Sequence, residues 1–169
     1  MSTKTTPTHE VSTVVSLPVQ APPSASATSP LIERLVTHHG GTWVDETNIA
    51  DWSAQGGDCV VLFAGDPVQF PMGLDVAVVL PELRSALKQN FRIGAVQRDN
   101  EAALARRYGS QRWPTLMFLR DGQYVTTLSG MHDWEDFVRE MQTALAQAPS
   151  RAPTIGIPVV NGNAASSCH

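Results

Sequence analysis

Residues 108–123 read YGSQRWPTLMFLRDGQ and combine a helix end, a proline and a strand that turns back on itself. Gly109 closes the helical pattern DNEAALARRY, because glycine readily adopts the left-handed conformation that ends a helix. The apolar run TLMFLR leads to Asp121-Gly122, a dipeptide typical of tight hairpin turns. The stretch therefore predicts a helix that ends at Gly109, followed by a β-hairpin over residues 115–130.

Helices and strands alternate on either side of this hairpin. Ser29-Pro30 is typical of the start of a helix, and the segment LIERLVTHH that follows has one apolar face. Gly40-Gly41 is expected to end this helix. The further elements expected are a strand in TWVDE, a brief helix in TNIADWSAQ, a covered strand in DCVVLFA, a helix in VAVVLPELRSALKQN that Pro81 kinks, a strand in FRIGAVQ and a final amphipathic helix in DWEDFVREMQTALAQ. This order predicts an α/β fold with a central mixed sheet of four to five strands and helices on both faces.

The two ends of the chain differ in composition from its middle. Residues 1–29 are rich in Pro, Ser and Thr, and they are expected to form a disordered leader. Residues 30–148 form the expected folded domain, and residues 149–169 a flexible tail. The sequence has no export signal and no apolar run of about 18 residues, the length that spans a bilayer. We therefore expect a cytoplasmic protein without stable membrane insertion.

Charge and cysteine content limit the classes of function. The net charge of the 169 residues is −4, which disfavours nucleic acid as a partner and favours a cationic one. The cysteines, Cys59 and Cys168, do not have CxxC spacing, so neither a disulfide framework nor a zinc site is predicted. We expect no metal, no cofactor and no catalytic residue.

The stretch with WPT before the hairpin, together with the helix that contains Pro81, resembles the thioredoxin fold over about residues 31–147. The resemblance implies that the Trp113-Pro114 bond is cis and that it shapes a site where an extended peptide pairs. Aligning Pro81 with the helix proline of thioredoxins puts residues 73–76, GLDV, where CxxC would stand. Dithiol exchange needs an attacking thiolate and a resolving thiol, and this chain has neither at that place.

A more specific resemblance covers GDPVQFPMGLDVAVVLPEL, residues 65–83, and RYGSQRWPTLMFLRDGQYVTTLSGMHDWEDF, residues 107–137. These segments resemble the HyaE/HupG/HoxO family of [NiFe]-hydrogenase expression proteins. The resemblance implies a non-enzymatic chaperone that binds the hydrogenase small-subunit precursor, with its twin-arginine signal peptide and its iron–sulfur clusters, before export. Other hydrogenase accessory proteins are further partners that it implies.

Acidic residues are segregated along the sequence. Residues 35–83 contain no Lys or Arg, whereas they contain Asp45, Glu46, Asp51, Asp58, Asp66, Asp75 and Glu82. Carboxylates beside apolar side chains would complement two guanidinium groups that precede an apolar stretch. The candidate partner-binding residues are Asp66, Phe70, Met72, Asp75, Glu82, Trp113 and Pro114.

Other interpretations of these residues stay open. The acids could form a solvated face, Asp66 could cap a turn, and Asp75 is expected to cap the helix that follows it. Trp113 is either a lid on the core or a partner contact. The competing functions are a single-cysteine thiol oxidoreductase that uses Cys59 and a thioredoxin-like domain that docks onto another protein through Trp113-Pro114.

Overall fold

The computed structural model of the chain describes Met1 and residues 28–153. Most of the predicted leader and most of the predicted tail lie outside the described residues, so both stay predictions. Across the described part, no helix is both long enough and apolar enough to span a bilayer.

The described residues follow the alternating order that the sequence predicts. The elements are α1 (Pro30–Thr37), β1 (Thr42–Val44), α2 (Ile49–Ser53), β2 (Asp58–Phe63), α3 (Met72–Leu87), β3 (Arg92–Val96), α4 (Arg98–Tyr108), β4 (Thr115–Arg120), β5 (Gln123–Ser129) and α5 (Trp134–Ala146). Helix α3 begins at Met72, four residues before the predicted start at Val76.

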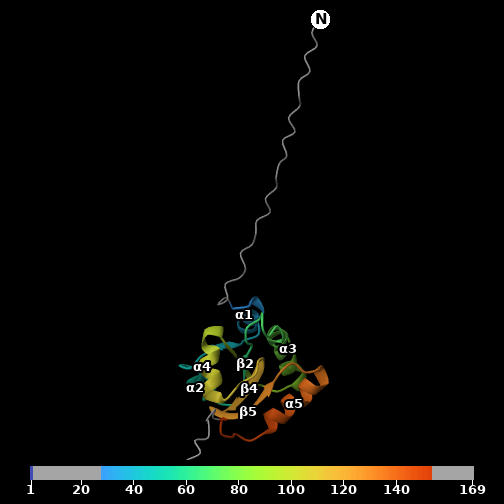
Figure 1. The fold of residues 1–169 in the computed structure, drawn as a ribbon. Helices are drawn as coiled ribbons and strands as arrows, with labels where there is room; N and C mark the ends of the chain where they lie inside the picture. Colours follow the sequence, from blue (N-terminus) through green and yellow to red (C-terminus); the bar gives the residue numbers. More distant parts are fainter. Residues whose placement is uncertain (2–27, 154–169) are drawn as a thin grey trace, which may run out of the picture.

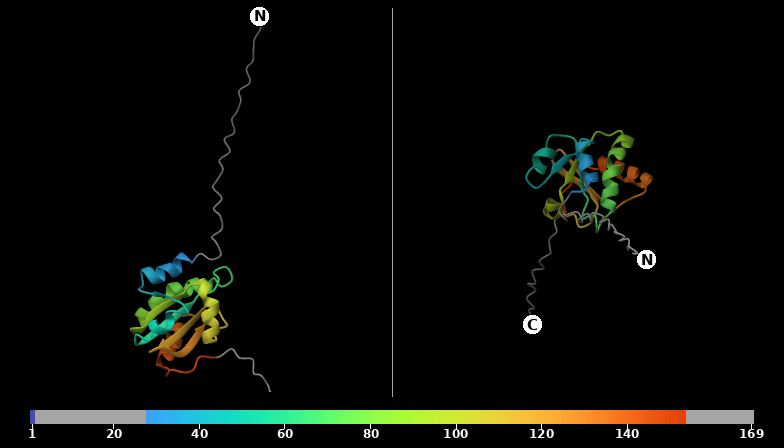
Figure 2. Two further views of the ribbon diagram at one scale, coloured as in Figure 1. Left: turned by 90° about the vertical axis from the view of Figure 1, so that its left-hand side faces the viewer. Right: turned by 90° about the horizontal axis from the view of Figure 1, so that it is seen from above.

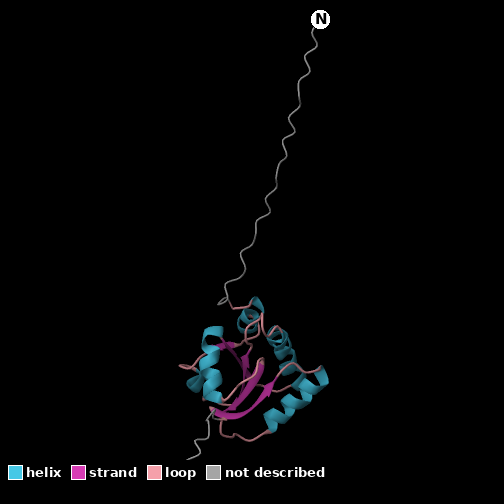
Figure 3. Ribbon diagram, in the orientation of Figure 1, coloured by secondary structure: helices cyan, strands magenta, loops and turns pink. Residues whose placement is uncertain are grey.

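The strands form one mixed sheet in the order β1-β3-β2-β4-β5. Strands β1, β3 and β2 are parallel, while β4 is antiparallel to both β2 and β5. Figure 3 shows these strands between the helices. The predicted α/β architecture with a mixed sheet is therefore confirmed.

Each face of the sheet has its own core, because successive side chains of a strand point to opposite faces. Val60 and Leu62 of β2 pack in one core with residues of α1, α3 and α5. Val61 and Phe63 pack in the other core with residues of α2 and α4. Figure 2 shows α2 separated from α3 and α5 when the molecule is seen from above.

The turns form where the sequence places them. The Ser29 hydroxyl accepts a hydrogen bond from the Leu31 N–H at 3.4 Å and caps α1. Gly109 closes α4 with φ +69°, and Asp121 and Gly122 both have positive φ in the hairpin turn. The Trp113-Pro114 bond is cis, as the resemblance implied.

One edge of the sheet gathers the starts of three helices. Two antiparallel pairings separate β5 from β2, so β5 runs in the same direction as β2 and β3. Helices α3, α4 and α5 follow these three strands and begin at their carboxyl ends. Strand β4 runs the other way, and its first residue, Thr115, pairs with Phe63 at the same edge. Trp113-Pro114 therefore meets the loops of this carboxyl edge, where α/β proteins commonly bind ligands.

Candidate protein-binding site

The loop between β2 and α3 folds back on itself at the carboxyl edge. The side-chain carboxylate of Asp66 accepts a hydrogen bond from the Val68 N–H at 2.9 Å. The main-chain carbonyl oxygen of Asp66 accepts one from the Phe70 N–H at 2.6 Å. These bonds confirm that Asp66 organises the turn. They also bring the Phe70 ring back over the end of β2.

Phe70 and Trp113 form an aromatic ridge. Their ring centroids lie 5.8 Å apart with 28° between the ring planes. Gly65 lies beneath the ridge with φ +78°, and a Cβ there would be 2.8 Å from Cδ2 of Phe70 and 2.9 Å from Cβ of Trp113. The close approach and the positive φ both require glycine at this position.

A hollow lies on each side of the aromatic ridge. The α4 cleft, of about 440 Å³, is lined by Gly65, Asp66, Gln69, Phe70, Arg98, Asp99, Glu101, Ala102 and Trp113. The β5 hollow, of about 370 Å³, is lined by Phe70, Gln111, Arg112, Trp113, Ser129 and Gly130. Both rings of the ridge contribute to both hollows, so an extended ligand could cross from one to the other.

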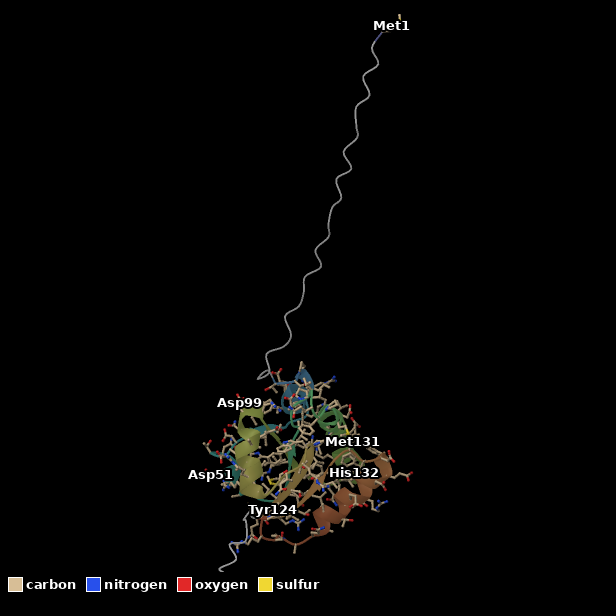
Figure 4. The ribbon with its side chains drawn as sticks, viewed as in Figure 1. Met1, Asp51, Asp99, Tyr124, Met131 and His132 are labelled. Atoms are coloured by element: carbon tan, nitrogen blue, oxygen red, sulfur yellow. The ribbon has the colours of Figure 1, made fainter. Side chains whose placement is uncertain are left out.

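The two hollows differ in charge. The α4 cleft holds the carboxylates of Asp66, Asp99 and Glu101, and its one basic group, Arg98, contacts Asp66 at 2.8 Å. The β5 hollow is lined by Arg112 and by no carboxylate from the described residues. Figure 4 shows Asp99 at the start of α4 and Tyr124 toward the opposite end of that helix.

Glu101 anchors the floor of the α4 cleft. Its side chain is 5 % exposed, and its two carboxylate oxygens accept the Gly65 N–H at 3.0 and 3.1 Å. Burial raises the pKa of the Glu101 carboxyl above its ordinary value, although hydrogen bonds from the backbone of Gly65 and Ala64 and the charge of Arg98 act in the opposite direction. Glu101 therefore links α4 to the residue on which the aromatic ridge rests.

The structure brings together only part of the predicted set. Asp66, Phe70 and Trp113 line the α4 cleft, and Pro114 follows Trp113 with its carbonyl oxygen bonded to the Gly130 N–H at 2.8 Å. Met72, 44 % exposed, is the first residue of α3.

The last two predicted acids lie on α3. Asp75 is exposed in the first turn, and the expectation that it caps the helix is wrong, because Pro71 occupies the cap position. Glu82 lines a separate groove with Leu31, Arg34 and Val78. It lies ten residues beyond Met72, which is about 15 Å along a helix. Glu82 therefore does not join the cleft.

The acidic window of the sequence does not form one acidic surface. Asp58 pairs with Arg120 at 2.6 Å and Asp66 pairs with Arg98 at 2.8 Å, so two of its acids have basic partners from outside the window. Further acidic residues at the carboxyl edge come from outside the window, in the first turns of two later helices: Asp99 and Glu101 in α4, and Glu135 and Asp136 in α5.

Cys59, the residue of the oxidoreductase hypothesis, lies in β2 and is completely buried. Its Sγ accepts a hydrogen bond from Arg92 at 3.1 Å, and burial raises the pKa of the thiol despite that nearby charge. A buried thiol with a raised pKa has little of the thiolate that reacts.

We expect Cys59 to react slowly with a thiol reagent in the native protein and quickly in denaturant. The assay needs a Cys168→Ser variant, so that the labelling reports Cys59 alone. Rapid stoichiometric labelling of that variant without denaturant would restore the oxidoreductase hypothesis.

Metal ligation finds no support in the part of the chain that the structure describes. Residues 28–153 contain no group of three or more His, Cys, Asp or Glu side chains placed to hold an ion.

Comparison with known proteins gives consistent matches. The family model described as "Hydrogenase-1 expression protein HyaE" matches residues 31–137. The chain is 54 % identical over 149 residues to the hydrogenase expression/formation protein HoxO of Cupriavidus necator. The aligned region covers 87 % of this chain and 92 % of HoxO. The chain is 31 % identical over 129 residues to the hydrogenase expression/formation protein HupG of Bradyrhizobium diazoefficiens, with coverages of 74 % and 87 %.

Among solved structures, a mutant thioredoxin from Halobacterium salinarum aligns with a TM-score of 0.52. The two sequences are 20 % identical, and the alignment covers 64 % of this chain and 95 % of the thioredoxin. This likeness shows the fold alone: the domain is thioredoxin-like.

Proposed function

Because the chain belongs to the HyaE family of hydrogenase expression proteins, together with HoxO and HupG relatives, we propose that it is a non-redox chaperone of [NiFe]-hydrogenase maturation. A role in hydrogenase expression and formation follows from the family. The finer proposal is that the protein acts in the cytoplasm and holds the small-subunit precursor before export, through the twin-arginine signal peptide, the cluster-bearing subunit or both.

The observation that carries this proposal is a binding surface without a reactive thiol. At the carboxyl edge, where a thioredoxin places two cysteines, the chain places an aromatic ridge between two hollows. The one cysteine of the described residues is buried elsewhere, in β2. Such a surface suits a protein that holds a peptide without reacting with it.

The chemistry of the α4 cleft suits arginine. A guanidinium group pairs with carboxylates and stacks on aromatic faces, and the cleft offers both beside each other. In the proposal, Asp66, Asp99, Phe70 and Trp113 contact the peptide and Pro114 shapes its path. Met72 and Asp75, in the first turn of α3, line neither hollow. Glu82, in its separate groove, is left out of this surface.

A second candidate function uses the same ridge. A thioredoxin-like domain that docks onto a protein other than the hydrogenase precursor would also bury Trp113, so a Trp113 variant alone does not separate the two functions. The discriminating property is arginine dependence, because only the first proposal requires the guanidinium groups.

The proposal is tested by calorimetric titration with a twin-arginine signal peptide and with the same peptide carrying two lysines. We expect binding that weakens with the lysine peptide and at higher salt, because exposed charge pairs are screened. Trp113→Ala should weaken binding at least tenfold, roughly the effect of losing an interface hot spot. Trp134→Ala is the matched control, since Trp134 is 47 % exposed at the start of α5 and lines neither hollow. If the wild-type protein binds neither the arginine peptide nor the lysine peptide, signal-peptide recognition is refuted.

A further inference from the structure

We infer that the aromatic ridge fixes the direction of the bound peptide, so that an arginine side chain enters the α4 cleft and the apolar residues after it pass into the β5 hollow. The inference rests on the proposed function, since it takes an arginine-containing segment followed by apolar residues as the ligand. It adds which hollow receives which part.

The carboxylates decide which hollow receives the arginine. The α4 cleft has three carboxyl groups and one guanidinium, that of Arg98. Asp66 already binds Arg98 at 2.8 Å, and both oxygens of Glu101 accept the Gly65 N–H. Asp99 is exposed and makes no ion pair with any described residue, so it is the carboxylate with most capacity for an incoming guanidinium.

The β5 hollow rejects the same group. Arg112 lines it without a carboxylate from the described residues to balance its charge, so a peptide arginine placed there would meet a like charge. The remaining lining consists of the two rings of the ridge, Gln111, Ser129 and Gly130. Uncharged apolar side chains that follow the arginine encounter no such repulsion and can pack on the rings.

The ridge itself holds a polar group that lacks a partner. The Nε1–H of Trp113 is buried and donates to no acceptor in the described residues. A buried donor without an acceptor destabilises the folded protein. This nitrogen has almost no exposed surface, so it is not among the contacts that fix the direction of the peptide.

The direction is tested by nuclear magnetic resonance of the full chain with two spin-labelled twin-arginine peptides. One peptide carries the nitroxide next to the arginines, and the other carries it at the end of the apolar segment. We expect the first label to broaden the amide signals of Asp99 and Ala102, and the second to broaden those of Ser129 and Gly130. The reverse pattern, or equal broadening of both groups by either label, overturns the inference and leaves the proposed function intact.

Affinities of two variants complete the test. Asp99→Asn should weaken binding of the arginine peptide about three- to tenfold, which corresponds to the loss of a partly exposed charge-assisted bond. Glu135→Gln removes an exposed carboxylate from the first turn of α5 and should leave the affinity unchanged. Equal effects of both variants overturn the assignment of the arginine to the α4 cleft. Absence of binding to the wild-type protein refutes both the direction and the proposed signal-peptide recognition.

Discussion

Replacing Gly73 by alanine is expected to lower the free energy of unfolding by roughly 2–4 kcal/mol, the range of severe core disruptions. A Cβ at this position would lie 2.0 Å from the carbonyl oxygen of Ala64 and 2.8 Å from its carbonyl carbon. Both atoms belong to the backbone, so the first turn of α3 would have to move away from the end of β2. Denaturation in urea, with the variant beside the wild type, measures the change.

The sign of this effect is diagnostic. In an ordinary helix, glycine is less favourable than alanine by about 1 kcal/mol, so the same substitution would stabilise the protein. Met72→Ala is the control, because Met72 is the exposed neighbour in the same helical turn and should change stability little. A Gly73→Ala variant as stable as the wild type would show that α3 does not pack against Ala64 as closely as the structure has it.

The same contact explains why thiol chemistry cannot be restored simply. The alignment on Pro81 predicts CxxC at positions 73 and 76. Position 73 has no room for a Cβ, and the Val76 side chain is 1 % exposed. A Gly73→Cys, Val76→Cys variant is therefore strained at one thiol and covered at the other. The carboxyl edge lacks the space for dithiol chemistry as well as the cysteines.

The order of elements was predictable because local signals agree with the fold. Ser29-Pro30, Gly109 and Asp121-Gly122 each determine a helix end or a turn within a few residues of chain, and the structure has all three where the sequence places them. The start of α3 was missed because it lacks such a signal. Pro71 stands at the cap position and makes no side-chain hydrogen bond, so nothing local marks Met72 as helical.

The site was predictable where a single loop or a local sequence motif supplies it. Asp66 and Phe70 share a loop, and the proline pattern pointed to Trp113. Glu101 and Asp99 were missed because, in sequence, they are ordinary acids at the start of a polar helix. Only the parallel pairing of β2 with β3 brings that helix start beside Gly65, which is 36 residues from Glu101.

The acidic window shows the converse case, since acids that are neighbours in the sequence do not form one acidic surface in the structure. Asp58 and Asp66 begin and follow the same strand, and each pairs with an arginine contributed by a different element. The α4 cleft has three carboxyl groups, and only one of them, Asp66, belongs to the acidic window.

Replacing Glu101 by alanine is expected to destabilise the domain and to abolish the arginine-dependent part of peptide binding. The variant leaves the Gly65 N–H buried without an acceptor, which costs about 1–3 kcal/mol, and it adds the cost of the vacated volume. Gly65 supports the aromatic ridge, so its displacement also disturbs the binding surface. Asp99→Asn, in the same helical turn but exposed, is the control for stability and should unfold like the wild type.

The Glu101→Gln variant separates the hydrogen bond from the charge, because the amide keeps one acceptor and does not titrate. Burial raises the pKa of Glu101 above 4.5, so the folded protein holds that proton more tightly than the unfolded chain does. The tighter proton binding stabilises the folded protein fully at pH values below the pKa that Glu101 has in the unfolded chain. This stabilisation is lost as the pH rises through the higher pKa that Glu101 has in the folded protein.

The wild type should therefore lose stability relative to Glu101→Gln as the pH rises from the unfolded-state pKa of Glu101 through its folded-state pKa. Urea unfolding of both proteins across the acid range measures that difference, and a constant or opposite difference would show that the carboxylate is not held in a desolvated position.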